Sequence, residues 1–218
     1  MAVKSVRRAR GRPRSSEREA VETRRVLLDA AAELIAEHGY RGTTVNDIVA
    51  RSRLSKGTFY WHFKSKEDLL LAVLEERIDR PVMQLIERLK SASADEDMAP
   101  AASALFLELM TRGREAILLD HEYRALAMRD RRIRTRYLKR QTALRDALAT
   151  GLDARARELG APPFSVASAQ IATAYLNLGS ALAVERLIDA SSVPESLFGD
   201  TVALVYQGLV ARARSDAA

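Results

Sequence analysis

Three helix starts lie close together between residues 44 and 65 of this 218-residue chain. Thr44, Ser55 and Ser65 each stand directly before a short helical pattern, and their hydroxyl oxygens can accept hydrogen bonds from the free N–H groups of a first helical turn. Thr44 and Ser65 are also followed three residues later by an aspartate, which is the spacing of a capping box. Short helices joined by such tight turns leave no room for strands, so this part of the chain is predicted to be helical.

The remaining sequence is also patterned as helices. Apolar residues recur at steps of three and four from residue 16 to residue 38, and Gly39 is placed to end that helix. Pro81 should kink or restart the long helix that follows Ser65, because proline lacks the backbone donor and clashes one turn back. Beyond a polar loop over 91–100, the pattern predicts helices over 101–118, 122–128, 131–159, 165–188 and 194–212. Since no strand-like alternation or repeat is found, the predicted fold class is all-α.

The predicted organisation has three parts. Residues 1–15 form a basic arm without apolar periodicity, which we expect to be disordered in the free protein. Residues 16–64 form a three-helix domain, and residues 65–218 form a larger helical body. The hydrophobic fraction of 47% is sufficient for a buried core.

Positive charge is concentrated in the first third of the chain. Residues 1–66 contain fifteen Lys or Arg against seven Asp or Glu, whereas the remaining residues contain 20 basic and 22 acidic side chains. Such an asymmetry points to a polyanionic partner for the basic part. A charged N-terminus is also often a solvated tail, so charge by itself favours nucleic acid only modestly.

Residues 44–52 and 55–62 have the layout of a helix-turn-helix, with two short helices and a tight turn. The first turn of the second helix is crowded with small and basic residues and would present free N–H groups to an anion such as phosphate. These residues are Ser55, Lys56, Gly57 and Thr58.

Large side chains fill the rest of the second helix. Phe59 and Phe63 are one turn apart and should be core. Three consecutive residues cannot share one buried face, so at least one of Tyr60, Trp61 and His62 must be exposed. An exposed aromatic near the lysines could pack on sugars and donate to phosphates; those lysines are Lys56, Lys64 and Lys66. The plainer interpretation leaves Tyr60 half in the core and His62 as a surface residue at a helix end.

The stretches GYRGTTVNDIVA (39–50) and LSKGTFYWHFKSKEDLL (54–70) closely resemble the TetR family of bacterial regulators, over about residues 23–74. The resemblance implies a dimer whose recognition helices enter successive major grooves of a palindromic operator. It further implies repression that ends when a small molecule binds the C-terminal body. By position it implies base-edge contacts from Asn46, Lys56, Gly57 and Thr58, and phosphate contacts from Thr44, Tyr60, Trp61, His62 and Lys66.

Arg53 departs from the family pattern, which usually has glycine in this turn. A positive φ at this position would strain an arginine. Either the turn is adjusted, or Arg53 adopts a strained conformation and gains a phosphate contact. Both alternatives keep Arg53 among the candidate DNA-binding residues.

The arm contains a short motif, Arg10-Gly11-Arg12-Pro13-Arg14, that resembles the core of an AT-hook. Proline would hold an extended path, and the three arginines would meet the negative potential of a narrow A·T-rich minor groove. A solvated tail with weak non-specific attraction to DNA is an equally good interpretation of five basic and small residues.

The last two predicted helices are rich in small and apolar residues, including Ala172, Gly179, Ala181, Leu204 and Val205. Small residues allow close helix packing, so two such helices from each subunit could form a four-helix homodimer interface. The alternative is that this pair only completes the core of one subunit.

A ligand cavity is expected inside the helical body, where apolar and aromatic side chains accumulate. The candidate lining consists of Phe106, Leu109, Met110, Ile117, Leu126, Met128, Tyr137, Tyr175 and Leu178. Polar residues that could orient a ligand are His121, Tyr123, Gln141 and Asn177. The expected effector is an apolar or amphipathic small molecule.

Other classes of protein are less well supported. The sequence has no cysteine, three scattered histidines, no Ser/His/Asp order and no phosphate-binding glycine loop, so we expect neither an enzyme nor a metal or cofactor site. An architectural protein that coats A·T-rich DNA without an effector is the alternative function, and activation in place of repression is left open. With no apolar run of membrane length, the chain is expected to be cytoplasmic and without a membrane partner.

Overall fold

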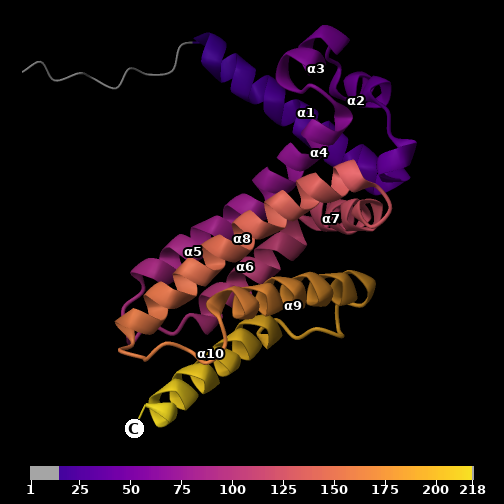
Figure 1. Cartoon of the computed structure of the whole chain (residues 1–218). Helices are drawn as coiled ribbons and strands as arrows, with labels where there is room; N and C mark the ends of the chain where they lie inside the picture. Colours follow the sequence, from indigo (N-terminus) through magenta and orange to yellow (C-terminus); the bar gives the residue numbers. More distant parts are fainter. Residues whose placement is uncertain (1–14, 218) are drawn as a thin grey trace, which may run out of the picture.

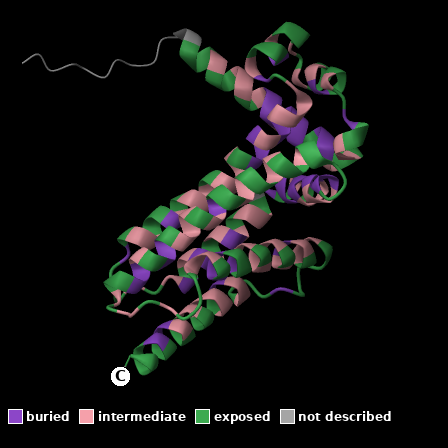
Figure 2. Ribbon diagram, viewed as in Figure 1, coloured by how far each residue is buried: buried purple, intermediate pink, exposed green. Residues whose placement is uncertain are grey.

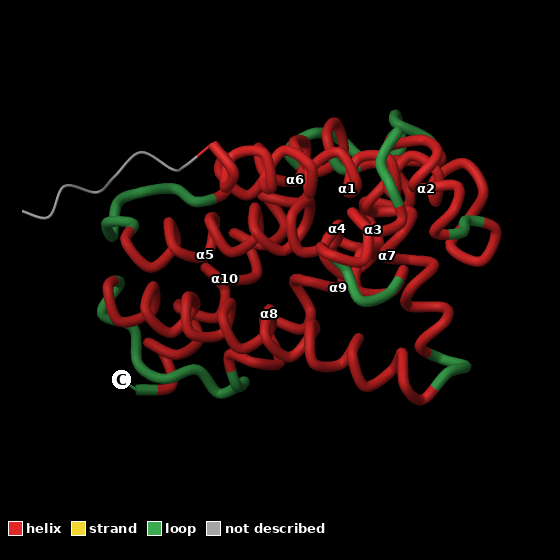
Figure 3. The backbone as a smooth tube through the Cα atoms, turned by 90° about the horizontal axis from the view of Figure 1, so that it is seen from above, coloured by secondary structure: helices red, strands yellow, loops and turns green. Residues whose placement is uncertain are grey.

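The computed structural model describes residues 15–217, and this part of the chain consists of helices and loops without a strand. In order the helices are α1 (Ser15–Gly42), α2 (Val45–Ser52), α3 (Lys56–His62), α4 (Lys66–Leu74), the π-helical turn η1 (Glu75–Asp79), α5 (Arg80–Ser91), α6 (Ala99–Arg112), α7 (Arg114–Ala127), α8 (Arg131–Glu158), α9 (Ser168–Ile188) and α10 (Leu197–Asp216). Figure 1 shows α2 and α3 at one end of the molecule and α10 at the other. Figure 3 shows the loops confined to the helix ends. The all-α prediction is confirmed.

Two predicted interruptions of the early helices are present. Gly39 has a φ of +73° and breaks α1 into two helical parts, because glycine adopts this conformation without a Cβ clash. Pro81 is the second residue of α5, which directly follows η1, and the Arg80 N–H donates to the Glu75 carbonyl. The chain therefore accommodates the proline by a widened turn in a continuous helical path, without a new start.

The prediction for residues 101–128 needs a correction. The break lies at Gly113 and not between 118 and 122. Gly113 ends α6 and begins α7, and its N–H donates to the Leu109 carbonyl at 2.9 Å. A Cβ at Gly113 would lie 2.7 Å from that carbonyl oxygen, so the close turn requires glycine. The polar residues from Asp120 to Glu122 belong to α7, and their side chains contact residues of other helices.

A single apolar core joins the first four helices to α7. Its members include Leu27 from α1, Ile48 from α2, Phe59 from α3, Leu70 from α4 and Tyr123 from α7, and none of them is measurably exposed. Burying side chains of this size stabilises the fold by roughly 1.5–3 kcal/mol each. Figure 2, viewed as Figure 1, shows buried residues gathered where α1 and α4 meet α7. The predicted division at residues 64 and 65 stays a prediction, because this core lies on both sides of it.

Among residues 15–217, no helix has the length and apolar character that a bilayer crossing requires.

Candidate nucleic-acid interface and ligand cavity

The predicted cap of α2 is formed by Thr44. Its side-chain oxygen accepts from the Asp47 N–H at 3.3 Å, and Asp47 Oδ2 accepts from the Thr44 N–H at 2.8 Å. The hydroxyl of Thr44, at 2.7 Å, and its N–H both donate to Asp47 Oδ2, and these bonds lower the pKa of the Asp47 carboxyl. The capping box sets the start of α2 and leaves Asn46 exposed on its first turn.

The predicted cap of α3 is formed by Ser55. Its Oγ accepts from the Thr58 N–H at 3.0 Å and lies 2.8 Å from Thr58 Oγ1. Lys56 and Gly57 are exposed on the first turn, while Phe59 is fully buried. Burial of Phe59 therefore orients α3 so that its first turn faces solvent.

Two of the three consecutive large side chains on α3 are exposed, as predicted. Tyr60 is 57% exposed and Trp61 is 73% exposed. His62 is half-buried, and its ring stands edge-on to Trp61 with 4.5 Å between the ring centroids. Burial, together with nearby Arg24, lowers the pKa of His62, so at neutral pH it would meet a phosphate as a neutral N–H donor. Lys64 follows the helix and is exposed.

Lys66 is already engaged inside the protein. Its Nζ donates to the carbonyls of Tyr40 and Thr43, at 2.6 Å each, and lies 4.1 Å from the centre of the Tyr40 ring. Burial lowers the pKa of this ammonium. Because an ammonium has three N–H donors, one remains for the predicted phosphate contact.

Arg53 has the left-handed conformation that the sequence suggested, with φ 55° and ψ 30°. It is the one residue other than glycine with a positive φ between residues 15 and 217. Its N–H closes α2 by donating to the carbonyls of Ala50 and Val49, and its side chain is exposed. The turn is thus not adjusted to the arginine, and the predicted phosphate contact remains a prediction. The candidate arm residues Arg10, Arg12 and Arg14 lie outside the described residues.

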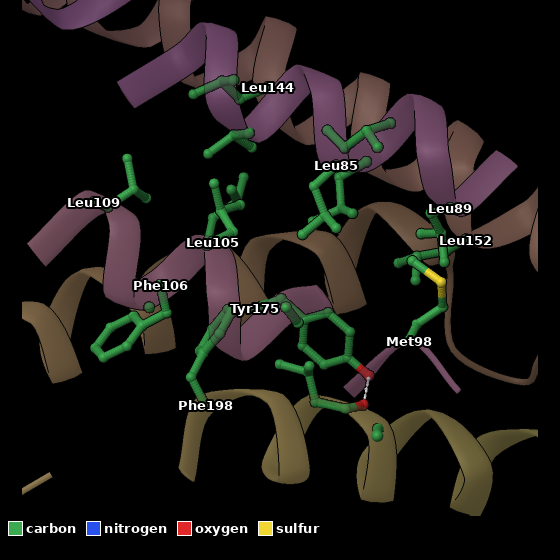
Figure 4. A pocket seen from close by; sticks show the side chains of 18 of the residues that line it. Leu85, Leu89, Met98, Leu105, Phe106, Leu109, Leu144, Leu152, Tyr175 and Phe198 are labelled. Carbon is green, nitrogen blue, oxygen red and sulfur yellow. Dashed lines mark hydrogen bonds between the residues drawn. The ribbon is translucent and has the colours of Figure 1, made fainter. Parts of the chain in front are cut away.

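A cavity of about 460 Å³ lies between the helices of the body. Leucine side chains of α5, α6 and α8 point into it, opposite Tyr175 of α9 and Phe198 of α10 (Figure 4). Seven candidate ligand residues line it: Phe106, Leu109, Met110, Ile117, His121, Gln141 and Tyr175. The Tyr175 hydroxyl donates to the Val202 carbonyl at 2.8 Å.

The other six candidate ligand residues do not line this cavity: Tyr123, Leu126, Met128, Tyr137, Asn177 and Leu178. Helical geometry explains this result for α7, where Ile117, Asp120, His121 and Arg124 share the cavity face and Tyr123 and Leu126 lie off it. Tyr123 is instead fully buried in the core that joins the first four helices to α7, and its hydroxyl donates to Glu67 Oε1 at 3.0 Å. Tyr137 packs against the same core.

The remaining candidates outside the cavity lie near a helix end or on a helix face that points away from it. Met128 caps the end of α7 and is 69% exposed. Asn177 is exposed and donates to the Thr173 carbonyl of its own helix. On α9 the cavity face contains Tyr175, Leu176, Gly179 and Ser180, so Leu178 lies off that face.

A buried ion-pair cluster lines the cavity and was not predicted. Arg140 donates to both oxygens of Asp79, at 2.7 and 3.0 Å from Nε, and also to Asp120 Oδ1. Burial raises the pKa of Asp79, although Arg140 acts in the opposite direction. The cluster therefore contains two carboxylates that share one guanidinium.

Three further polar side chains meet at the same end of the cavity. Arg124 Nη2 donates to Ser180 Oγ at 3.2 Å, and Ser180 Oγ lies 3.2 Å from His121 Nε2. Arg124 Nη2 is 3.9 Å from Asp120 Oδ2, which is beyond hydrogen-bond distance. Only His121 of this group was predicted. The available signal was the spacing of Asp120, His121 and Arg124 on one face of α7, but charged helical residues are normally solvated.

At its other end the cavity is closed by the loop between α5 and α6. Buried Arg155 donates to the backbone carbonyls of Ala92, Ser93, Ala94 and Glu96 in that loop. Four carbonyl acceptors satisfy much of this guanidinium and tie the loop to α8. No group of three or more His, Asp or Glu among the described residues is arranged to hold a metal ion.

Residues 27–73 match the family model described as bacterial regulatory proteins of the tetR family. This match assigns residues 27–73, which contain α2, α3 and most of α4, to the TetR family. A fatty acid metabolism regulator protein of Bacillus subtilis is 34% identical over 99 residues, which is 45% of this chain and 51% of that protein. The chain thus spans about half the length of this curated relative.

Solved structures of TetR-family regulators share the whole fold. A regulator from Rhodococcus sp. has a TM-score of 0.68 at 23% identity, covering 87% of this chain and 99% of its own. FadR from Bacillus subtilis, in complex with stearoyl-CoA, has a TM-score of 0.67 at 21% identity, covering 84% and 96%. At these identities the likeness establishes the fold, including the body that has no sequence motif.

Helices α9 and α10 have both a buried and an exposed apolar face. Ala172 of α9 and Val210 of α10 are buried within the subunit. Leu204 and Val205 of α10 are 71% and 46% exposed, and Ile188 at the end of α9 is 76% exposed. The helix pair thus completes the subunit core and also leaves apolar surface available, which the predicted homodimer would cover.

Proposed function

We propose that this chain is a dimeric transcriptional regulator that represses by binding a palindromic DNA operator and is released by a small amphipathic ligand in the body cavity. The observation that carries the proposal is the outer face of α3, where Lys56, Tyr60 and Trp61 are exposed on a helix anchored by buried Phe59. A single seven-residue helix offers little contact area, and a symmetric pair doubles it.

The cavity supports the ligand-dependent part of the proposal. Its volume of about 460 Å³ lies in the range of pockets that bury drug-sized molecules, and most of its lining is apolar. The related structure of FadR from Bacillus subtilis contains stearoyl-CoA, a ligand with a long apolar chain. By analogy this chain would bind an apolar or amphipathic molecule, and we assign it no catalytic activity.

Helix α7 offers a physical route between the cavity and the DNA-binding helices. His121 lines the cavity, the next residue Glu122 accepts from the Tyr40 N–H at 2.7 Å, and Tyr123 donates to Glu67 of α4. A ligand that displaces α7 would therefore disturb the break in α1 and the start of α4 together. Because the packed core does not deform continuously, such a shift would reorient α2 and α3.

Genome-wide footprinting of the purified full-length protein tests the proposed class. A few palindromic sites are expected, whereas broad coverage of A·T-rich DNA would favour the architectural alternative. Once an operator is known, Lys56→Ala should cost about 1–3 kcal/mol and relax specificity at one base pair, while Lys64→Ala should weaken all sequences alike. Identical behaviour of the two variants would contradict the assignment of base and phosphate contacts.

A further inference from the structure

The wall of the cavity away from Arg124 is aliphatic. Leu85 and Leu89 of α5, Leu105 of α6, and Leu144, Leu148 and Leu152 of α8 line it, and Figure 4 shows several of these side chains directed toward one another across the space. Tyr175 and Tyr206 also line the cavity, but their hydroxyls already donate to the carbonyls of Val202 and Leu152. This wall suits a hydrocarbon chain or an aromatic body.

The opposite end of the cavity presents donors. Arg124, His121 and Ser180 meet there, and all three line the cavity. Among the side chains that the structure describes, Arg124 Nε is the buried nitrogen or oxygen without a hydrogen-bond partner. A buried donor without an acceptor is unfavourable, so this group is poised to receive an acceptor from a ligand.

The carboxylates near Arg124 do not satisfy it. Asp120 accepts from Arg140 and remains 3.9 Å from the closest Arg124 nitrogen, and both Asp79 oxygens also accept from Arg140. Arg140 is thus saturated by carboxylates, whereas Arg124 contacts the hydroxyls of Ser180 and Tyr137 and its Nε has no acceptor. A ligand acceptor would complete the hydrogen bonding of Arg124 without displacing an existing ion pair.

Charge also sets the direction in which an amphiphile would lie. Asp95, Glu96 and Asp97 line the far end of the cavity, beside Arg155. Arg155 and Arg88, which pairs with Glu96, offset two of these three charges, and the donors of Arg155 are taken by backbone carbonyls and are not free for a ligand. An anionic head is therefore disfavoured at the loop end and favoured at Arg124.

We propose that the effector, assuming the regulatory function proposed above, is an amphiphile with a single carboxylate head. The carboxylate accepts from Arg124 and from the one donor that the hydrogen-bonded pair of Ser180 and His121 leaves free, and the apolar body lies along the leucines of α5, α6 and α8. A carboxylate fits because it has only acceptors and because its charge strengthens the hydrogen bond to a guanidinium. A chain ending in an ammonium would place donors against donors.

Calorimetric titration of the full-length protein distinguishes these head groups. The probes are dodecanoate, methyl dodecanoate and dodecylammonium, each below its micelle-forming concentration, so that the alkyl chain is the same and only the head differs. Dodecanoate should bind about tenfold or more tightly than its methyl ester, the ratio expected of one charge-assisted hydrogen bond. Dodecylammonium should bind more weakly than both.

Arg124→Gln should remove the preference for dodecanoate over its ester and leave the affinity for the ester nearly unchanged. Arg129→Gln is the matched control, because Arg129 is exposed just beyond the end of α7 and does not line the cavity. Equal affinity for acid and ester, an equal loss of both in Arg124→Gln, or no binding of dodecanoate would overturn the proposal. Circular dichroism of each variant verifies that its helical content is unchanged.

Operator binding without any ligand is measured on the same preparation. If the operator is bound but dodecanoate is not, the carboxylate proposal fails and the regulatory function stands. If dodecanoate binds but no specific DNA site is found, the regulatory function fails. When both hold, dodecanoate should shift operator binding in the wild type and not in Arg124→Gln at the same ligand concentration.

Discussion

Replacing Arg53 with glycine should stabilise this protein and weaken its binding to DNA. Arg53 ends α2 with φ 55°, and a left-handed conformation costs a residue with a Cβ roughly 1–2 kcal/mol. Glycine removes that cost but makes the unfolded chain more flexible, which costs roughly 0.5–1 kcal/mol. The backbone N–H that bonds to Ala50 and Val49 is retained, and the exposed side chain contributes little packing.

The expected net gain is therefore about 0.5–1 kcal/mol in the free energy of unfolding. For a chain of this length, that corresponds to a rise in Tm of roughly 1–4 °C, which scanning calorimetry can resolve. If Arg53 also contacts a phosphate, its loss should flatten the slope of log K against log salt by about 0.9 in an anisotropy titration of the operator. The variant would thus be more stable and less tightly bound.

Two control substitutions separate strain from charge. Arg53→Lys keeps both the charge and the strained conformation, so its Tm and its salt slope should stay near those of the wild type. Arg53→Asn removes the charge and tolerates the left-handed region, so its salt slope should match that of Arg53→Gly. A lower Tm in Arg53→Gly would refute the strain argument, and an unchanged salt slope would refute the phosphate contact.

Three further perturbations test other parts of the molecule. Deleting residues 1–14 should weaken operator binding and flatten its salt slope, by about 0.9 for each phosphate that the arm neutralises; unchanged binding would remove the arm from the mechanism. Leu204→Arg places a charge on the exposed apolar face of α10, so analytical ultracentrifugation should show a monomer where the wild type is a dimer, and a persistent dimer would mean another interface. Arg140→Met leaves Asp79 and Asp120 buried without their guanidinium, which should cost about 3–5 kcal/mol in a urea titration. Because burial already raises the pKa of Asp79 and its protonated form is the one tolerated, this loss should be smaller at about pH 5 than at about pH 8, and a loss that grows as the pH falls would contradict the assignment.

The local features of the DNA-binding half could be read from the sequence. Caps act over three residues, so Thr44, Ser55 and Ser65 identified the starts of α2, α3 and α4 directly. Helical periodicity placed Phe59 inward, and the crowding of three large side chains required exposed aromatics. For Arg53 the resemblance left two alternatives, an adjusted turn or a strained arginine, and the structure shows the left-handed conformation.

The cavity depended on tertiary structure. Periodicity tells which residues share a face of α7, but both of its faces contact other helices, and only packing assigns His121 to the cavity and Tyr123 to the core. The pairing of Arg140 with Asp79 spans 61 residues, and no local pattern records such a partner. Sequence by itself determined the caps, the break at Gly39 and the exposed aromatic side chains of α3, since these depend on neighbours along the chain. The tertiary structure decided which polar groups are buried together, because burial and pairing depend on helices that the chain brings together from far apart.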